Sequence, residues 1–146
     1  MSRTNAAETD YLTLLFNNVD WANIGDAGGL QNSVAAGDFH VSLHTADPTE
    51  TGDQTSSEAT YTSYARIAVA RTAGGWTITG NTADNAAAIT FPEATGGSET
   101  ITHVGIGTDL SGAGNLIWSG SLDTSRAVSS GITPSFAIGD LNVTAD

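Results

Sequence analysis

Three histidines, His40, His44 and His103, are the side chains in this sequence best suited to bind a metal ion. His40 and His44 share one face of an alternating segment, but four positions along a strand separate two residues by about 13 Å. Zinc ligands all lie about 2 Å from one ion, so this pair cannot chelate a metal by itself. His103 could join one of them from another strand, but a third ligand would then have to come from a distant carboxylate. We therefore expect exposed strand histidines and no metal site.

Other patterns that carry chemistry are also missing. The chain has no cysteine, which removes disulfides and thiolate ligands, and no lysine, which a phosphate-binding P-loop needs. It contains no G-x-S-x-G segment for a nucleophilic serine, no G-x-G-x-x-G segment and no calcium-binding loop. A pair of carboxylates for glycoside hydrolysis stays open, because their separation depends on the folded chain. We expect no enzymatic activity and no cofactor.

The N-terminal part of the sequence has the spacing of a helix. Its apolar residues follow the i, i+3, i+4, i+7 pattern of one helical face: Leu12, Leu15, Phe16 and Val19. The pattern predicts a helix over residues 11–23, preceded by a polar arm over residues 1–10. Such a helix either covers the open end or face of a sheet or docks on a neighbouring subunit.

The rest of the sequence has the period of strands. In residues 39–45, apolar side chains alternate with His40, Ser42 and His44, which is typical of a half-buried strand. Residues 49–60 lack any apolar period and predict a long exposed loop.

Two apolar runs, residues 101–106 and 116–119, flank a glycine-bearing segment and predict an antiparallel hairpin. The remaining runs are residues 64–71, 76–79, 87–91, 132–138 and 141–144. About eight short strands at this spacing predict an all-β fold, an antiparallel, jelly-roll-like β-sandwich with one N-terminal helix. We expect a single domain over residues 11–146.

Charge restricts the partners. Sixteen acidic residues face four basic ones, all of them arginine, which gives a net charge of −12. Nucleic-acid backbones and anionic membranes both attract clustered basic residues, so neither is an expected partner. No apolar run approaches the roughly 20 residues that span a bilayer, and the first residues lack the apolar core of a signal peptide. We expect a protein made in the cytoplasm.

Several segments carry a resemblance to a known family. They are His44-Thr45-Ala46-Asp47-Pro48, Tyr64-Ala65-Arg66, Ala88 to Thr95, Ile101 to Ile106, Asn115 to Gly120 and Leu141 to Thr144. In their order along nearly the whole chain, the sequence resembles small virion proteins of tailed bacteriophages, often labelled tail-fibre proteins and similar to capsid decoration (cement) proteins. The matching segments mark strand and turn positions, so the resemblance supplies no catalytic residues.

The resemblance implies a structural role. A decoration protein would sit on the capsid exterior, bind the major capsid protein at junctions between subunits, and stabilise the shell as a homotrimer. A protein that binds only the assembled shell stabilises it by mass action. The first alternative is a tail or head fibre module that contacts the host surface. An alternative of another class is a glycan-binding or glycan-cleaving module, which predicts two carboxylates about 5–10 Å apart in a groove and an exposed aromatic ring.

Contacts with other proteins are expected at the ends of the molecule. The candidates are the N-terminal arm and helix, together with the loop over residues 49–60, since loops at the end of a sandwich are free to meet neighbours. The residues singled out are Arg3, Tyr11, Leu12 and Phe16. The competing interpretation is that Leu12 and Phe16 fill the core of their own subunit.

Overall fold

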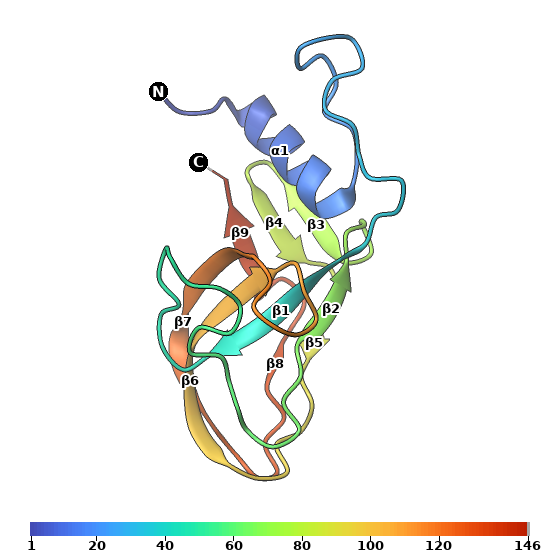
Figure 1. Cartoon of the computed structure of the whole chain (residues 1–146). Helices are drawn as coiled ribbons and strands as arrows, with labels where there is room; N and C mark the ends of the chain where they lie inside the picture. Colours follow the sequence, from blue (N-terminus) through green and yellow to red (C-terminus); the bar gives the residue numbers. More distant parts are fainter. Residues whose placement is uncertain (146) are drawn as a thin grey trace. The chain divides into compact units, whose positions relative to one another are not determined.

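The structure, a computed structural model, describes residues 1–145. Within this range the regular elements are strands, apart from one helix near the N-terminus (Figure 1). The elements are α1 (Asn5–Asn17), β1 (Asp38–His44), β2 (Ile67–Ala70), β3 (Trp76–Thr79), β4 (Thr82–Asn85), β5 (Ile89–Thr90), β6 (Ser98–Gly107), β7 (Leu116–Ser129), β8 (Ser135–Phe136) and β9 (Asn142–Thr144). The pairs β1–β6, β3–β4, β4–β9 and β6–β7 are antiparallel. The predicted fold class, an all-β antiparallel fold with one N-terminal helix, is confirmed.

The chain forms two compact units that interleave along the sequence. Unit 1 contains residues 1–38, residues 70–89 and the described residues from Phe136 onward, and unit 2 contains residues 39–69 and 90–135. The sheets have the strand orders β2-β1-β6-β7, β3-β4-β9 and β5-β8. A single domain over residues 11–146 stays a prediction.

Helix α1 differs in its bounds from the predicted helix over residues 11–23. It begins at Asn5 because the Thr4 hydroxyl accepts a hydrogen bond from the Ala7 N–H, as an N-cap residue does. It ends at Asn17 because Asn18 takes a left-handed backbone conformation, with φ of 54°, and its N–H bonds to the carbonyl of Thr13. The polar arm predicted over residues 1–10 is therefore mostly helix.

In unit 1, α1 packs against the β3-β4-β9 sheet through its apolar face. Leu12 and Phe16 are fully buried, and the Phe16 ring meets the Trp76 ring edge-on with centroids 4.7 Å apart. Thr9 Oγ1 also donates a hydrogen bond to the Gly80 carbonyl in the β3–β4 turn, at 2.7 Å. The helix thus covers one face of this sheet, as one of the two sequence interpretations proposes.

In unit 2, β6 and β7 form the hairpin that the glycine-bearing segment predicts. Their register places Ile106 opposite Trp118, and β1 pairs with the other side of β6, with Val41 opposite Ile106. A long bulge interrupts the β6–β7 pairing, since Ile101 lies opposite Arg126 but His103 lies opposite Ser121. β7 is the edge strand of this sheet, so its outer side is not paired within the described chain.

The prediction of an exposed loop over residues 49–60 is wrong for part of that segment. Gln54 is fully buried and Ala59 is 4% exposed. The chain folds back along the end of β1, where the Ala59 N–H donates to the Leu43 carbonyl at 2.8 Å and the Thr45 N–H donates to the Ser57 carbonyl at 2.8 Å. Residues 57–59 therefore pair with the end of β1, and the Gln54 side chain covers Gly107 of β6.

Candidate functional site

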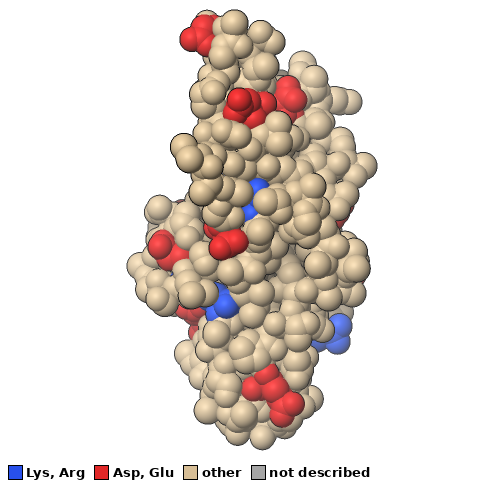
Figure 2. All heavy atoms as spheres, turned by 90° about the vertical axis from the view of Figure 1, so that its right-hand side faces the viewer, with Lys and Arg blue, Asp and Glu red and all other residues tan. Residues whose placement is uncertain are grey.

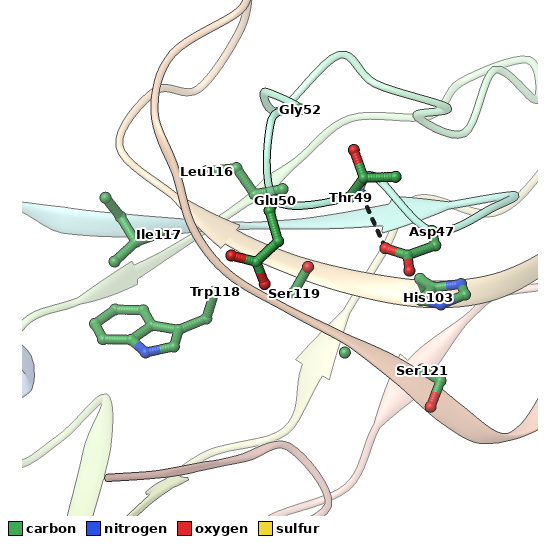
Figure 3. A pocket seen from close by; sticks show the side chains of 11 residues that line it. Asp47, Thr49, Glu50, Gly52, His103, Leu116, Ile117, Trp118, Ser119 and Ser121 are labelled. Carbon is green, nitrogen blue, oxygen red and sulfur yellow. Dashed lines mark hydrogen bonds between the residues drawn. The ribbon is translucent and has the colours of Figure 1, made fainter. Parts of the chain in front are cut away.

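The loop that follows β1 and the first half of β7 enclose an open groove of about 640 Å³ in unit 2 (Figure 3). Six of its lining residues have side chains that are able to form hydrogen bonds: Asp47, Thr49, Glu50, His103, Ser119 and Ser121. Leu116, Ile117 and Trp118 add apolar surface. The groove contains no arginine, and the chain has no lysine, so its charged groups are carboxylates.

A tight turn shapes the loop side of the groove. Asp47 Oδ1 accepts a hydrogen bond from the Thr49 N–H at 2.8 Å, the local bond by which aspartate favours turns. Thr49 has a left-handed backbone with φ of 65°, and the Gly52 N–H donates to the Thr49 carbonyl at 3.2 Å. A Cβ on Gly52 would lie 2.0 Å from the Pro48 carbonyl oxygen, so only glycine fits this turn. The turn places Glu50 over the strand opposite.

On the strand side of the groove, the alternation of side chains along β7 and the register of β7 with β6 place the lining residues. Ser119 and Ser121 are two positions apart on β7, so their side chains share a face. Ser121 lies opposite His103 of β6, which is half-buried, and the Nδ1 of His103 is 2.9 Å from the Thr102 hydroxyl. In Figure 3, Glu50 and Ser119 extend toward the same space, with His103 and Asp47 on the other side of it.

Three of these side chains are able to form hydrogen bonds with a ligand. Within the part of the chain that the structure describes, the side chains of Glu50, Ser119 and Ser121 form no hydrogen bond to the protein, and all three residues are exposed. Hydroxyls both donate and accept, and a carboxylate accepts through two oxygens. The groove can therefore hold a ligand that offers several donors and acceptors.

Trp118 does not present its ring to the groove. The ring meets Phe39 edge-on, with centroids 5.6 Å apart and an interplanar angle of 89°, and Figure 3 shows it turned away from Glu50. The groove therefore contains two carboxylates, those of Asp47 and Glu50, but Trp118 does not supply the aromatic ring that the glycan interpretation predicts.

Behind the groove, a buried polar cluster fixes the loop to the sheet. His44 and Ser42 are both fully buried, which corrects the prediction that the strand histidines are exposed. His44 Nε2 lies 2.8 Å from Ser42 Oγ, and its Nδ1 lies 2.8 Å from the Ser56 carbonyl oxygen. Because a carbonyl only accepts, Nδ1 carries the proton and Nε2 accepts from the serine.

This serine–histidine pair has the residue types of a nucleophile and its base, but no room for a substrate. A Cβ on Gly105 would lie 2.7 Å from both His44 Nε2 and Ser42 Oγ, so the Gly105 backbone closes the site. Burial also lowers the pKa of His44 below its ordinary value, which keeps the ring neutral near pH 7. We interpret the pair as a structural element.

A second part of the cluster joins residues far apart in the sequence. Arg66, which is 5% exposed, donates to both carboxylate oxygens of Glu58 and to the carbonyls of Asp109 and Gly112. The Tyr64 hydroxyl donates to Glu58 Oε1 at 3.0 Å. Burial raises the pKa of Tyr64, so the phenol stays protonated and acts as a donor at neutral pH.

Acidic side chains are scattered over the face of the molecule shown in Figure 2, with few arginines between them.

Among residues 1–145, no three His, Asp or Glu side chains are placed to hold a metal ion. Helix α1, the one helix in this range, has 13 residues, fewer than the roughly 20 that a membrane span needs.

The residues singled out for protein contact have different positions. Leu12 and Phe16 lie in the core of unit 1, as the competing interpretation states. Arg3 and Tyr11 lie together near the surface, with the Arg3 guanidinium 4.4 Å from the Tyr11 ring centroid. Contact of these residues with another protein stays a prediction.

Sequence reasoning did not find the groove. Asp47-Pro48 marks a turn, and Ser119 and Ser121 alternate along a strand, but neither signal says that the two segments face each other. Glu50 has no local pattern at all. The register of β6 with β7 and the fold of the loop bring these residues together.

The chain matches the family model described as Podophage GP4 fiber I protein gp80 over residues 4–144. No curated protein matches the sequence.

Proposed function

This chain belongs to the podophage GP4 fiber I protein gp80 family, and on that premise we propose that it is a fibre subunit of a phage virion that contacts the host surface. The family is one of phage virion proteins, and the match over residues 4–144 is the observation that carries the proposal. The sequence resemblance to small virion proteins predicts the same general role. A virion protein of this kind acts by binding, since it needs surfaces for its neighbours and no reaction centre.

The fold supports a fibre role in two ways. Its loops contain ordered turns, such as the Asp47–Gly52 turn, and these loops are held on an antiparallel sheet. Many proteins present a binding surface on loops held by such a scaffold. Its net charge of −12 suits a protein whose surface faces solvent and not packaged nucleic acid.

Capsid decoration, the first choice from the sequence, places the same fold on the head and not on a fibre. The family description favours the fibre, and decoration stays a prediction. The associated expectations, a homotrimer bound to the major capsid protein on the capsid exterior, stay predictions as well.

Labelling intact particles tests the proposal. Antibody fragments raised against the full chain, imaged by electron microscopy on purified virions, should mark fibres and leave the head surface bare. Quantitative mass spectrometry of the same particles should give a small number of copies. Label spread over the whole head, with hundreds of copies per particle, would establish decoration and reject the fibre.

A further inference from the structure

We propose that the groove between the Asp47–Gly52 turn and strand β7 binds a neutral saccharide. The inference rests on the proposed function, for which it names the ligand class and the site. It concerns binding and not cleavage.

The charge of the groove excludes anionic ligands. The groove contains the carboxylates of Asp47 and Glu50 and no basic side chain other than the imidazole of His103. An anionic ligand, such as a phosphate, a sulfate or a uronic acid chain, would meet like charge there, and the net charge of −12 adds to that repulsion. The ligand therefore carries no net negative charge.

The donors and acceptors that line the groove favour a ligand with many hydroxyl groups. Glu50 offers acceptors, and Ser119 and Ser121 offer hydroxyls that donate and accept, with no protein partner for any of the three in the described chain. His103 uses Nδ1 with Thr102, and among residues 1–145 no protein group forms a hydrogen bond with its Nε2. The two oxygens of the Glu50 carboxylate can accept hydrogen bonds from hydroxyl groups of a ligand. A polyhydroxyl chain satisfies this set of donors and acceptors better than an apolar ligand does.

The apolar lining and the shape complete the match. Leu116 is half-buried and Ile117 is 43% exposed, so the groove also offers surface to the C–H faces of a sugar ring. The groove is open and not a closed pocket, and Figure 3 shows Glu50 and Ser119 at its centre. An open groove accepts an internal stretch of a chain as well as its end.

The exposure of the two groove carboxylates favours binding of a saccharide without its cleavage. The general acid of a glycoside hydrolase is held in an apolar pocket that keeps it protonated. Asp47 and Glu50 are both exposed, and Asp47 Oδ1 is occupied by the Thr49 N–H. The groove therefore has the hydrogen-bonding groups for recognition and lacks the burial for acid catalysis.

The test uses the full-length protein and a printed panel of probes: neutral oligosaccharides of glucose, galactose, mannose and N-acetylglucosamine, polygalacturonate, and a lysine-rich peptide. We expect binding to at least one neutral oligosaccharide, with its Kd then measured by calorimetry. Ser119→Trp, which fills the groove, should weaken that binding at least about tenfold, and Glu50→Gln should weaken it several-fold, which corresponds to about 1 kcal/mol.

Two matched controls separate groove effects from effects on folding. Ser125→Trp places the same side chain at another exposed position on β7, outside the groove, and Glu93→Gln removes an exposed carboxylate elsewhere in unit 2. Both should keep the wild-type Kd, and all four variants should keep the wild-type thermal midpoint. Unchanged binding by Ser119→Trp would overturn the site.

Other outcomes also reject the inference. Binding of polygalacturonate or of the peptide alone would assign the groove to another ligand class, and release of reducing sugar would show an enzyme. Absence of saccharide binding would remove the inference but leave the fibre location, which the particle labelling decides independently.

Discussion

Glu58 and Arg66 form a two-point ion pair inside unit 2, with Arg66 Nε 2.6 Å from Oε1 and Nη2 2.8 Å from Oε2 of the carboxylate. The Arg66 side chain is only 2% exposed and that of Glu58 is 16% exposed. The same guanidinium reaches the carbonyls of Asp109 and Gly112 at 2.8 Å each. One arginine thus ties the covering loop to the segment between β6 and β7.

Removing the carboxylate of this pair should destabilise the protein strongly. Glu58→Ala leaves a buried guanidinium without its counter-charge, and we expect a loss of about 3–5 kcal/mol in the free energy of unfolding. Urea denaturation followed by tryptophan fluorescence measures it. The double variant Glu58→Leu with Arg66→Met should recover much of that loss, because it removes both charges. A loss below about 1 kcal/mol for Glu58→Ala would contradict the buried-pair account.

The stability of the protein should fall in mild acid because of His44. Burial lowers the pKa of His44 below 6.5, so the unfolded chain binds a proton in a pH range where the folded chain does not. The contribution of His44 is therefore complete above about pH 6.5 and is lost progressively as the pH drops toward its folded pKa. Thermal midpoints measured from pH 8 to pH 5 should decline below about pH 6.5.

The variant His44→Gln, which cannot take up a proton, tests the assignment to this residue. Its thermal midpoint should be lower at pH 8 but should depend less on pH between 7 and 5. The matched variant His40→Gln, at a more exposed position on the same strand, should keep the wild-type slope. A wild-type slope in His44→Gln would mean that other groups cause the acid sensitivity.

Gly105 should tolerate no side chain. A Cβ at this position would lie 2.7 Å from His44 Nε2, Ser42 Oγ and Leu116 Cδ1, so Gly105→Ala overpacks the cluster and should cost about 1–3 kcal/mol. Gly120→Ala is the control on the neighbouring strand, where no atom lies within 4 Å of the added Cβ. It should be neutral or slightly stabilising. Equal effects of the two variants, measured by chemical denaturation, would show that the Gly105 contact is not limiting.

Arg71 should be important for the end of helix α1. Its guanidinium donates to the carbonyls of Leu14 and Leu15 in the last turn and to that of Ala36 at 3.0 Å. A hydrogen bond from a charged donor contributes about 1.5–3 kcal/mol, so Arg71→Ala should lose at least the contribution of one such bond, about 2 kcal/mol or more of unfolding free energy. Arg126→Ala, at an exposed position, should change stability by less than about 0.5 kcal/mol. A small effect of Arg71→Ala on the denaturation midpoint would refute this role.

The spacing of apolar residues along the chain is enough to predict the class of fold. Alternation in residues 39–45 and the two runs around the segment 108–114 place strands correctly, because a period of two is a property of adjacent residues. The apolar spacing of Leu12 and Phe16 indicates the helix and its buried face, although the start at Thr4 depends on a cap that the prediction did not use. The charge and the absence of lysine are likewise properties of the sequence alone.

Which polar residues are buried, and which form the groove, depends on the folded chain and could not be predicted from the sequence. His44 alternates like a solvent-facing residue, yet the loop over residues 45–60 covers it, and the buried Arg66–Glu58 pair ties that loop to the segment between β6 and β7. Glu50 and Ser119 both line the groove although they are far apart in the sequence. No local period in the sequence predicts that these two distant residues line the same groove. This arrangement results from strand register and from hydrogen bonds between distant segments, which exist only once the chain has folded.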